Sequence, residues 1–169
     1  MSALLEGEEE TLYLKDRTKL SDCQVSGSLP DNDCTPGAVF QDATKEKICV
    51  QGYTKTVRSV STNLRKQVFA EYGISYPQSF GSYEVDHLIP LSLGGSNNIA
   101  NLFPEAAEPA PGFKEKDVVE NYLHEEVCAG RVALSVAQER ISDNWFLIYD
   151  NLELRVIREL RLKYPNWAE

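Results

Sequence analysis

An aspartate and a histidine stand next to each other at positions 86 and 87, inside the stretch YEVDHLIPLSLGGSNNIANLFPE (83–105). The carboxylate of Asp86 is the kind of ligand that binds a hard divalent cation. The imidazole of His87, when neutral, is a good base near pH 7. The pair therefore suits metal-assisted hydrolysis, in which a cation stabilises charge on a leaving oxygen and the histidine activates water.

Three polar residues further along the chain could complete such a site. Asn101 lies fourteen residues after His87 and could hydrogen-bond backbone groups, which would hold the intervening loop closed. Asn121 and His124 are three residues apart, so on a helix they share one face and both could reach the cation. The plain alternatives are a core position for His87 and a merely exposed one for His124.

Short elements would have to position the Asp86–His87 pair. Apolar segments predict a strand pair over 83–85 and 88–93, followed by a turn at Gly94–Gly95 and a short helix over 97–102. Neighbours on a strand point to opposite faces, so both side chains can serve one site only at a bend or at a strand end.

The remaining chain predicts a mostly helical α+β protein. Apolar residues at helical spacing predict three helices, over 61–73, over 114–128 and from 135 to a stop before Pro165. The segment 48–58 has β-branched and aromatic residues around a glycine, which favours an extended conformation.

Size and charge limit the classes of protein that this chain can belong to. Its 169 residues suit one domain, which we expect over 31–169, and residues 1–30 predict a loosely ordered arm. The net charge of -9 argues against coating nucleic acid by bulk attraction, but it allows a local basic patch. No apolar run approaches the length of a membrane span.

The spacing of the cysteines favours disulfides over a zinc knuckle. The chain has four, without a C-x-x-C pair, and an even count permits two disulfides whose pairing the sequence does not define. A bridge from Cys128 to Cys34 or Cys49 would clamp an N-terminal segment to the 114–128 helix. Cysteines of this kind slightly favour a secreted or cell-envelope location, although the first residues do not have the layout of a signal peptide.

Several basic residues are candidates for binding substrate phosphates, and each could equally be a solvated charge. They are Lys116, Arg58, Lys55 and Arg65. No recognition helix or finger motif is present, so substrate choice would depend on backbone contacts and groove shape.

The motifs together resemble those of the HNH, or ββα-metal, endonuclease family. The matching segments are CTPGAV (34–39), ICVQGYT (48–54), DHLIPLSLGG (86–95), NLFPE (101–105) and KDVVENYLH (116–124). The resemblance extends from residue 34 to near residue 148. It implies a ββα-metal hairpin and helix that hold one metal ion, embedded in a mostly helical single domain.

The resemblance also assigns roles by position. His87 would be the general base, Asp86 a metal ligand and Asn101 the residue that braces the loop. Either His124 or Asn121 would be the second protein ligand, with His124 preferred. The gap between Asn101 and His124 is wider than in compact HNH motifs.

These roles imply a metal-dependent endonuclease that hydrolyses phosphodiester bonds in DNA. RNA would be a second possible substrate. The enzyme would use one divalent metal ion as cofactor. Mg²⁺ is the preferred candidate, and Mn²⁺, Ca²⁺ and Zn²⁺ are the alternatives. The competing interpretation is an HNH-derived module that no longer cuts and serves in binding or in the envelope. Its motivation is the acidic total charge and the uncertain second ligand.

Overall fold

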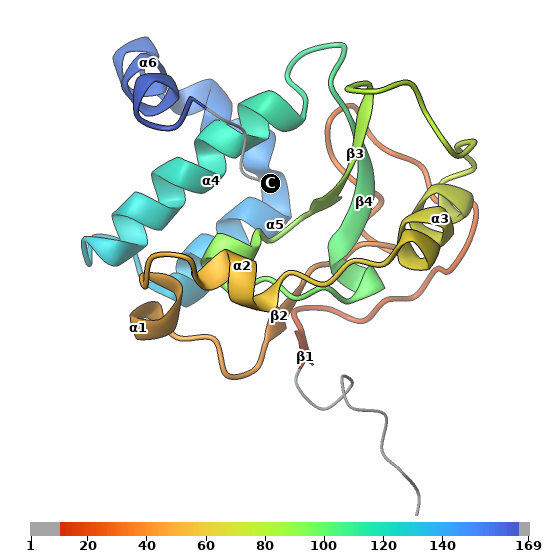
Figure 1. Cartoon of the computed structure of the whole chain (residues 1–169), viewed down its shortest axis with the longest axis horizontal. Helices are drawn as coiled ribbons and strands as arrows, with labels where there is room; N and C mark the ends of the chain where they lie inside the picture. Colours follow the sequence, from red (N-terminus) through yellow and green to blue (C-terminus); the bar gives the residue numbers. More distant parts are fainter. Residues whose placement is uncertain (1–10, 166–169) are drawn as a thin grey trace, which may run out of the picture.

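Two small antiparallel sheets and six α-helices make up residues 11–165 of the computed structural model, which is the part of the chain that the structure describes (Figure 1). The α+β class expected from the sequence is confirmed at this level. Within the described residues, no helix combines the length and the apolar composition that crossing a bilayer requires.

The central feature is a strand pair followed by a helix. Strand β3 (Tyr83–His87) pairs antiparallel with β4 (Leu102–Ala106), and helix α4 (Phe113–Cys128) comes next. The long connection between the strands contains two 3₁₀ turns, η1 (Leu91–Leu93) and η2 (Ile99–Asn101).

The predicted helix over 114–128 is confirmed, but the predicted partner of the first strand is wrong. Residues 88–93 do not pair with 83–85. Leu88, Ile89 and Leu93 are fully buried in the core instead. A short apolar run indicates burial, and it does not by itself distinguish a strand from a buried turn.

The N-terminal residues that are described do not form a loose arm. Strand β1 (Thr11–Tyr13) pairs antiparallel with β2 (Ala38–Phe40), and a disulfide joins Cys23 to Cys34. Arg17 is ion-paired with Glu71. These contacts correct the expectation for residues 11–30, while its part over residues 1–10 lies outside the described residues.

Residues 53–57 of the segment 48–58 form a helix and residues 49–52 form turns and a bend, so the extended conformation expected there is wrong. Helix α1 (Lys45–Ile48) begins after Thr44, whose side chain accepts a hydrogen bond from the Lys47 amide. Helix α2 (Tyr53–Val57) follows Gly52, which has a φ of 85°. This left-handed conformation suits glycine, so Gly52 starts α2 rather than interrupting a strand.

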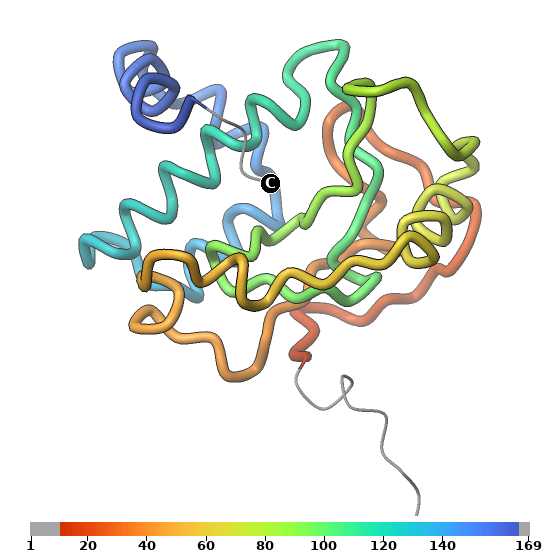
Figure 2. The backbone as a smooth tube through the Cα atoms, in the orientation of Figure 1, coloured from red at the N-terminus to blue at the C-terminus, as the bar shows by residue number. Residues whose placement is uncertain are grey.

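The other helices surround the strand pair. Helix α3 (Thr62–Glu71) is confirmed, and Ser61 caps it. The single long C-terminal helix expected from the sequence is two helices, α5 (Leu134–Asn151) and α6 (Leu154–Lys163). The backbone is also non-helical inside α5, at Asn144, and Figure 2 shows the change of direction between α5 and α6.

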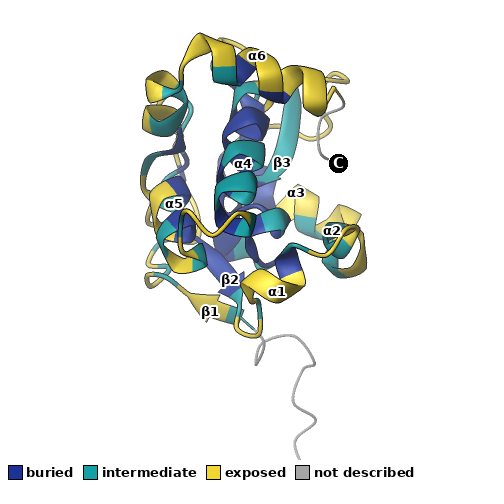
Figure 3. Cartoon of the chain, turned by 90° about the vertical axis from the view of Figure 1, so that its left-hand side faces the viewer, coloured by how far each residue is buried: buried dark blue, intermediate teal, exposed yellow. Residues whose placement is uncertain are grey.

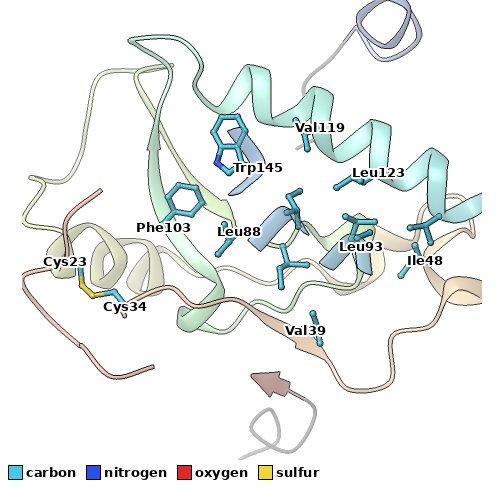
Figure 4. Packing of buried hydrophobic residues seen from close by; sticks show 14 of the residues in the cluster. Cys23, Cys34, Val39, Ile48, Leu88, Leu93, Phe103, Val119, Leu123 and Trp145 are labelled. Carbon is cyan, nitrogen blue, oxygen red and sulfur yellow. A yellow bond between two sulfur atoms is a disulfide. The ribbon is translucent and has the colours of Figure 1, made fainter. Parts of the chain in front are cut away.

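The main core lies between α4, α5 and the β3–β4 pair. Figure 4 shows Trp145 of α5 and Phe103 of β4 in this core, together with apolar residues of α4. Figure 3 shows that α4 is mostly buried or half-buried, whereas α1 and α6 are largely exposed. Helix α4 is therefore a central element of the core, whereas α3 packs against both strands of the pair.

Candidate functional site

Asn101 closes the loop between β3 and β4. Its side chain is fully buried. Its Oδ1 accepts a hydrogen bond from the Ile89 amide at 2.9 Å, and its Nδ2 donates to the carbonyl oxygens of Ile89 and Ser96, each at 2.9 Å. These are the backbone contacts that the sequence predicted for Asn101. They fix the chain that follows His87.

The glycine pair allows the same loop to pack tightly. Gly94 has a φ of 79°, which favours glycine. A Cβ atom on Gly95 would lie 1.7 Å from the carbonyl oxygen of Ile89. Only a residue without a side chain fits at this position, so Gly95 serves close packing of the loop as well as the turn.

His87 is a buried histidine whose proton position follows from its neighbour. Its Nε2 lies 3.0 Å from Oδ1 of Asn97, and Nδ2 of Asn97 donates to the carbonyl oxygen of Val57 at 2.7 Å. Because Oδ1 of Asn97 can only accept, Nε2 of His87 carries the proton and Nδ1 keeps a lone pair. Burial lowers the pKa of His87 to about 4, so the ring is neutral near pH 7.

Asp86 faces α4, where a buried lysine holds it. Lys116 is fully buried, and its Nζ lies 3.0 Å from Oδ2 of Asp86. The same Nζ donates to Oε1 of Glu120 at 2.6 Å and to the backbone carbonyl oxygen of His87 at 2.7 Å. Lys116 therefore joins the first turns of α4 to the end of β3.

Lys116 does not have the role that the sequence suggested for it, which was to bind substrate phosphates. A fully buried ammonium that contacts three oxygens of its own chain is not free to bind substrate phosphates. Burial lowers its pKa, but the charges of Asp86 and Glu120 outweigh that effect and hold the pKa above its usual range. The sequence missed this because burial of position 116 depends on how α4 packs.

Four further carboxyl groups surround this ion pair. Glu84 lies directly opposite Glu105 in the β3–β4 pair, and α4 contributes Asp117 and Glu120. Burial, reinforced by neighbouring negative charge, raises the pKa of Glu84 and of Glu120 to about 7 and that of Asp117 to about 9. The site thus holds more negative charge than its buried lysine compensates.

Asp86 and Glu105 behave as an unequal pair of acids. For Asp86, burial raises the pKa, but the Lys116 charge outweighs it and the pKa is lowered. For Glu105, burial and the Asp86 charge raise the pKa well above its ordinary value. Asp86 is therefore the ionised member near neutral pH.

Within residues 11–165, no hydrogen bond or ion pair joins His124 or Asn121 to Asp86. His124 Nε2 lies 3.0 Å from the carbonyl oxygen of Ile48 and 3.6 Å from Sγ of Cys128. His124 lies two helical turns beyond Lys116, which is about 12 Å along the axis of α4. Asn121 is half-buried on the same helix. Thus His124 lies beside α1, whereas Lys116 joins the acids to β3. Figure 1 shows the course of α4 past these elements.

The surroundings of His124 include a different candidate metal group. One ligand atom from each of Cys49, His124 and Cys128 lies within 4.8 Å of the others, so the group could hold a metal ion. Cys49 and Cys128 are joined in a disulfide, however. Because the thiolate is the form that binds metal, reduction must come first. A sulfur and imidazole set would then suit zinc better than magnesium.

The cysteines pair partly as the sequence suggested. Cys128 is bonded to Cys49, one of its two predicted partners, and Cys34 is bonded to Cys23. The Cys49–Cys128 bridge clamps the end of α1 to the end of α4. Two disulfides favour an oxidising compartment.

The remaining predicted phosphate contacts are exposed. Arg58, Lys55 and Arg65 all face solvent, on or next to α2 and α3. The positive charge of Arg58 contributes to the lowered pKa of His87 and opposes the raised pKa of Glu84. Arg58 is therefore the exposed cation that acts electrostatically on the site.

The sequence did not identify Asn97, Glu105 or Glu120 as site residues. Asn97 stood in the quoted stretch as one of several asparagines, with nothing to separate it from Asn98. Glu105 is the last residue of the NLFPE segment, and its place in that motif was the only feature of the sequence that could have marked it as a site residue. Comparisons of this chain with family models, with curated proteins and with solved structures give no match.

Proposed function

We propose that this protein is a metal-dependent endonuclease that hydrolyses phosphodiester bonds in DNA, and in RNA as a further substrate. One observation carries the proposal. Lys116 of α4 contacts both the Asp86 carboxylate and the His87 carbonyl oxygen, so the helix that follows the hairpin is fixed at the end of β3. Asp86, which could bind metal, and His87, whose imidazole is neutral, are consecutive at that strand end, and the order of a strand pair followed by a helix resembles that of the HNH, or ββα-metal, family.

In this proposal, each residue at the strand end has a separate task. Nδ1 of His87 takes a proton from the attacking water, while Asn97 holds the other ring nitrogen. Asn101 keeps the loop closed around both. Arg58, which is exposed, attracts the polyanion. A divalent ion held by Asp86 would stabilise charge on the departing oxygen.

The buried acids fit a hard divalent ion. Glu105 is buried next to Asp86, and neither of its carboxylate oxygens has a hydrogen-bond partner among the described residues. Oxygen ligands of this kind suit Mg²⁺ or Mn²⁺. The neighbours of His124 and its separation from Lys116 give no support to His124 as the second ligand.

The competing function, a binding or envelope module that does not cut, has one observation in its favour. His87 is only 5 % exposed, and Lys116 already balances part of the Asp86 charge. A nuclease would need the substrate or a local opening to give water access to His87. An inactive module would need no such opening.

Nicking of supercoiled plasmid separates the two functions. We expect the oxidised protein to nick plasmid with Mg²⁺ or Mn²⁺ and to stop when a chelator is added. The His87→Ala variant should lose about 10²–10⁴-fold in rate, the usual contribution of a general base. His124→Ala, with the only other histidine changed, is the matched control and should keep its activity. An inactive wild type would favour the module that does not cut.

A further inference from the structure

Glu105 is an acidic side chain that the rest of the described chain leaves unsatisfied. It is 3 % exposed, and both of its carboxylate oxygens lack a hydrogen-bond partner among residues 11–165. Burying a carboxylate is costly unless it is paired, hydrogen-bonded or bound to a metal. Glu105 therefore calls for a cation or a proton from outside the chain.

The nearby lysine does not satisfy Glu105. An ammonium group has three N–H donors. Lys116 donates to the His87 carbonyl oxygen and to Glu120 Oε1 and is ion-paired with Asp86. Within residues 11–165, no hydrogen bond joins Lys116 to Glu105.

The strand register brings Glu105 to the same face as Asp86. Glu105 lies directly opposite Glu84, and residues two apart on a strand share a face, so Asp86 lies diagonally across from Glu105. The Asp86 charge and a hydrogen bond that only protonated Glu105 could donate to Asp86 both contribute to the raised pKa of Glu105, so the two groups lie close together. Two carboxylates in such positions would repel, so the pair needs either a shared proton or a bound cation.

We propose that Asp86 and Glu105, from neighbouring strands, are the two protein ligands of the divalent cation, in place of Asp86 with His124 or Asn121. The inference rests on the proposed function, because it names the ligands of that site. Magnesium is commonly bound by one or two carboxylates, with water and substrate phosphates completing its shell. Two ligands are therefore enough.

The Asp86 side chain is 14 % exposed, but its Oδ2 and both Glu105 oxygens are buried, so a local opening has to admit the cation. Asp117 on α4 also has one buried carboxyl oxygen without a hydrogen-bond partner among the described residues. Lys116 acts as a positioning residue, because it holds Asp86 against the helix while leaving Glu105 open to the cation.

Binding of Mn²⁺, measured by the electron paramagnetic resonance of the free ion, tests the assignment without any activity assay. We expect the oxidised wild-type chain to bind one Mn²⁺ at this site. Glu105→Gln, which keeps the shape and removes the charge, should weaken binding at least about tenfold, equivalent to 1.4 kcal/mol. The matched variants His124→Ala and Asn121→Ala should bind as the wild type does.

The melting temperature gives an independent measurement. In chelator, Glu105→Gln should melt at or above the wild-type temperature, because the variant removes the cost of burying Glu105, which must take up a proton on folding near neutral pH. Mn²⁺ should raise the melting temperature of the wild type more than that of Glu105→Gln. Asp86→Asn is a second variant that should also lose Mn²⁺ binding.

Equal Mn²⁺ affinity of wild type and Glu105→Gln would overturn the inference, as would loss of binding in His124→Ala alone. A wild type that binds no Mn²⁺ would also overturn it, even if that protein nicks plasmid. A wild type that binds Mn²⁺ through Glu105 but never nicks plasmid would support the ligand assignment and overturn the proposed function.

Discussion

The Asn97 side chain decides which nitrogen of His87 can act as a base. Because Asn97 donates to Val57 through its amide nitrogen, its oxygen must accept from His87, and the free lone pair lies on Nδ1. A plain core histidine would need only a hydrogen bond of some kind. The hydrogen bonds of His87 and Asn97 therefore define one tautomer, which is the form that general-base chemistry uses.

Replacing Asn101 should destabilise the protein more than replacing its neighbour. Asn101→Ala leaves buried backbone groups of Ile89 and Ser96 without partners, so we expect a loss of about 2–4 kcal/mol in the free energy of unfolding. Asn98→Ala removes the cap of the short 3₁₀ turn and an exposed hydrogen bond to the Tyr13 hydroxyl, and should cost less than about 1 kcal/mol. Urea unfolding of both variants measures the difference. Equal losses would mean that Asn101 does not brace the loop.

Local motifs predicted some site residues and missed others for a physical reason. Asp86, His87 and Asn101 belong to one continuous stretch, so residue type and spacing were enough to select them. Glu105 and Lys116 matter through burial, which depends on how β4 and α4 pack. Lys116 resembled a surface lysine in the sequence because nothing local indicates that its aliphatic stem lies in the core.

The elements were predictable where their signal was periodic. Helices α3 and α4 were found because their apolar residues repeat at helical spacing. The partner of β3 was not, because β4 follows a connection of fourteen residues and pairing over that distance leaves no local signal. The short helices α1 and α2 were missed because β-branched residues suggested a strand, although Thr44 and Gly52 fix helix starts there.

The end of α3 supplies a pH-dependent prediction. Burial raises the pKa of Tyr72 to about 12 from 10.0, although hydrogen bonds with Thr35 and the Asp31 amide lower it. The folded chain thus binds this proton more tightly than the unfolded chain. The resulting stability is fully present below about pH 10 and is lost as pH rises towards about pH 12, by about 2–3 kcal/mol in total.

The Tyr72→Phe variant tests this prediction. It lacks the titrating group, and it should be less stable than wild type at neutral pH because it loses two hydrogen bonds. The difference in the free energy of unfolding between the two proteins should shrink as pH rises above about 10. Parallel curves over that range would contradict the raised pKa. Other tyrosines titrate equally in both proteins, so the comparison cancels them.

Two disulfides connect distant parts of the whole chain. Cys49–Cys128 spans a sequence separation of 79 and Cys23–Cys34 one of 11. Chain entropy predicts a contribution of about 4–5 kcal/mol from the longer loop and about 3 kcal/mol from the shorter one. Removing the longer bridge should therefore cost more stability.

Paired alanine variants check this ranking. Cys49→Ala with Cys128→Ala should melt at a lower temperature than Cys23→Ala with Cys34→Ala, and a reductant should lower the melting temperature of the wild type. A wild-type melting curve that reductant leaves unchanged would contradict the clamp. The same double variant removes the sulfur ligands next to His124 and should leave Mn²⁺ binding at Asp86 and Glu105 unchanged.

The overall charge of the molecule suits local rather than bulk recognition of a polyanion. The chain carries a net charge of -9, and its candidate site is itself acidic. A bound divalent cation would therefore be needed to bring phosphate close to Asp86 and Glu105. Arg58 alone is exposed among the cations that act on His87, so the metal and Arg58 together would supply the local attraction.

The central claim is that the imidazole at position 87 takes the proton from water, and chemical rescue tests it most directly. His87→Gly leaves a cavity beside Asn97 that free imidazole can enter. We predict that this variant does not nick supercoiled plasmid with Mn²⁺ alone and that added imidazole restores nicking in a concentration-dependent way. Nicking at the wild-type rate by His87→Gly without imidazole would contradict the claim.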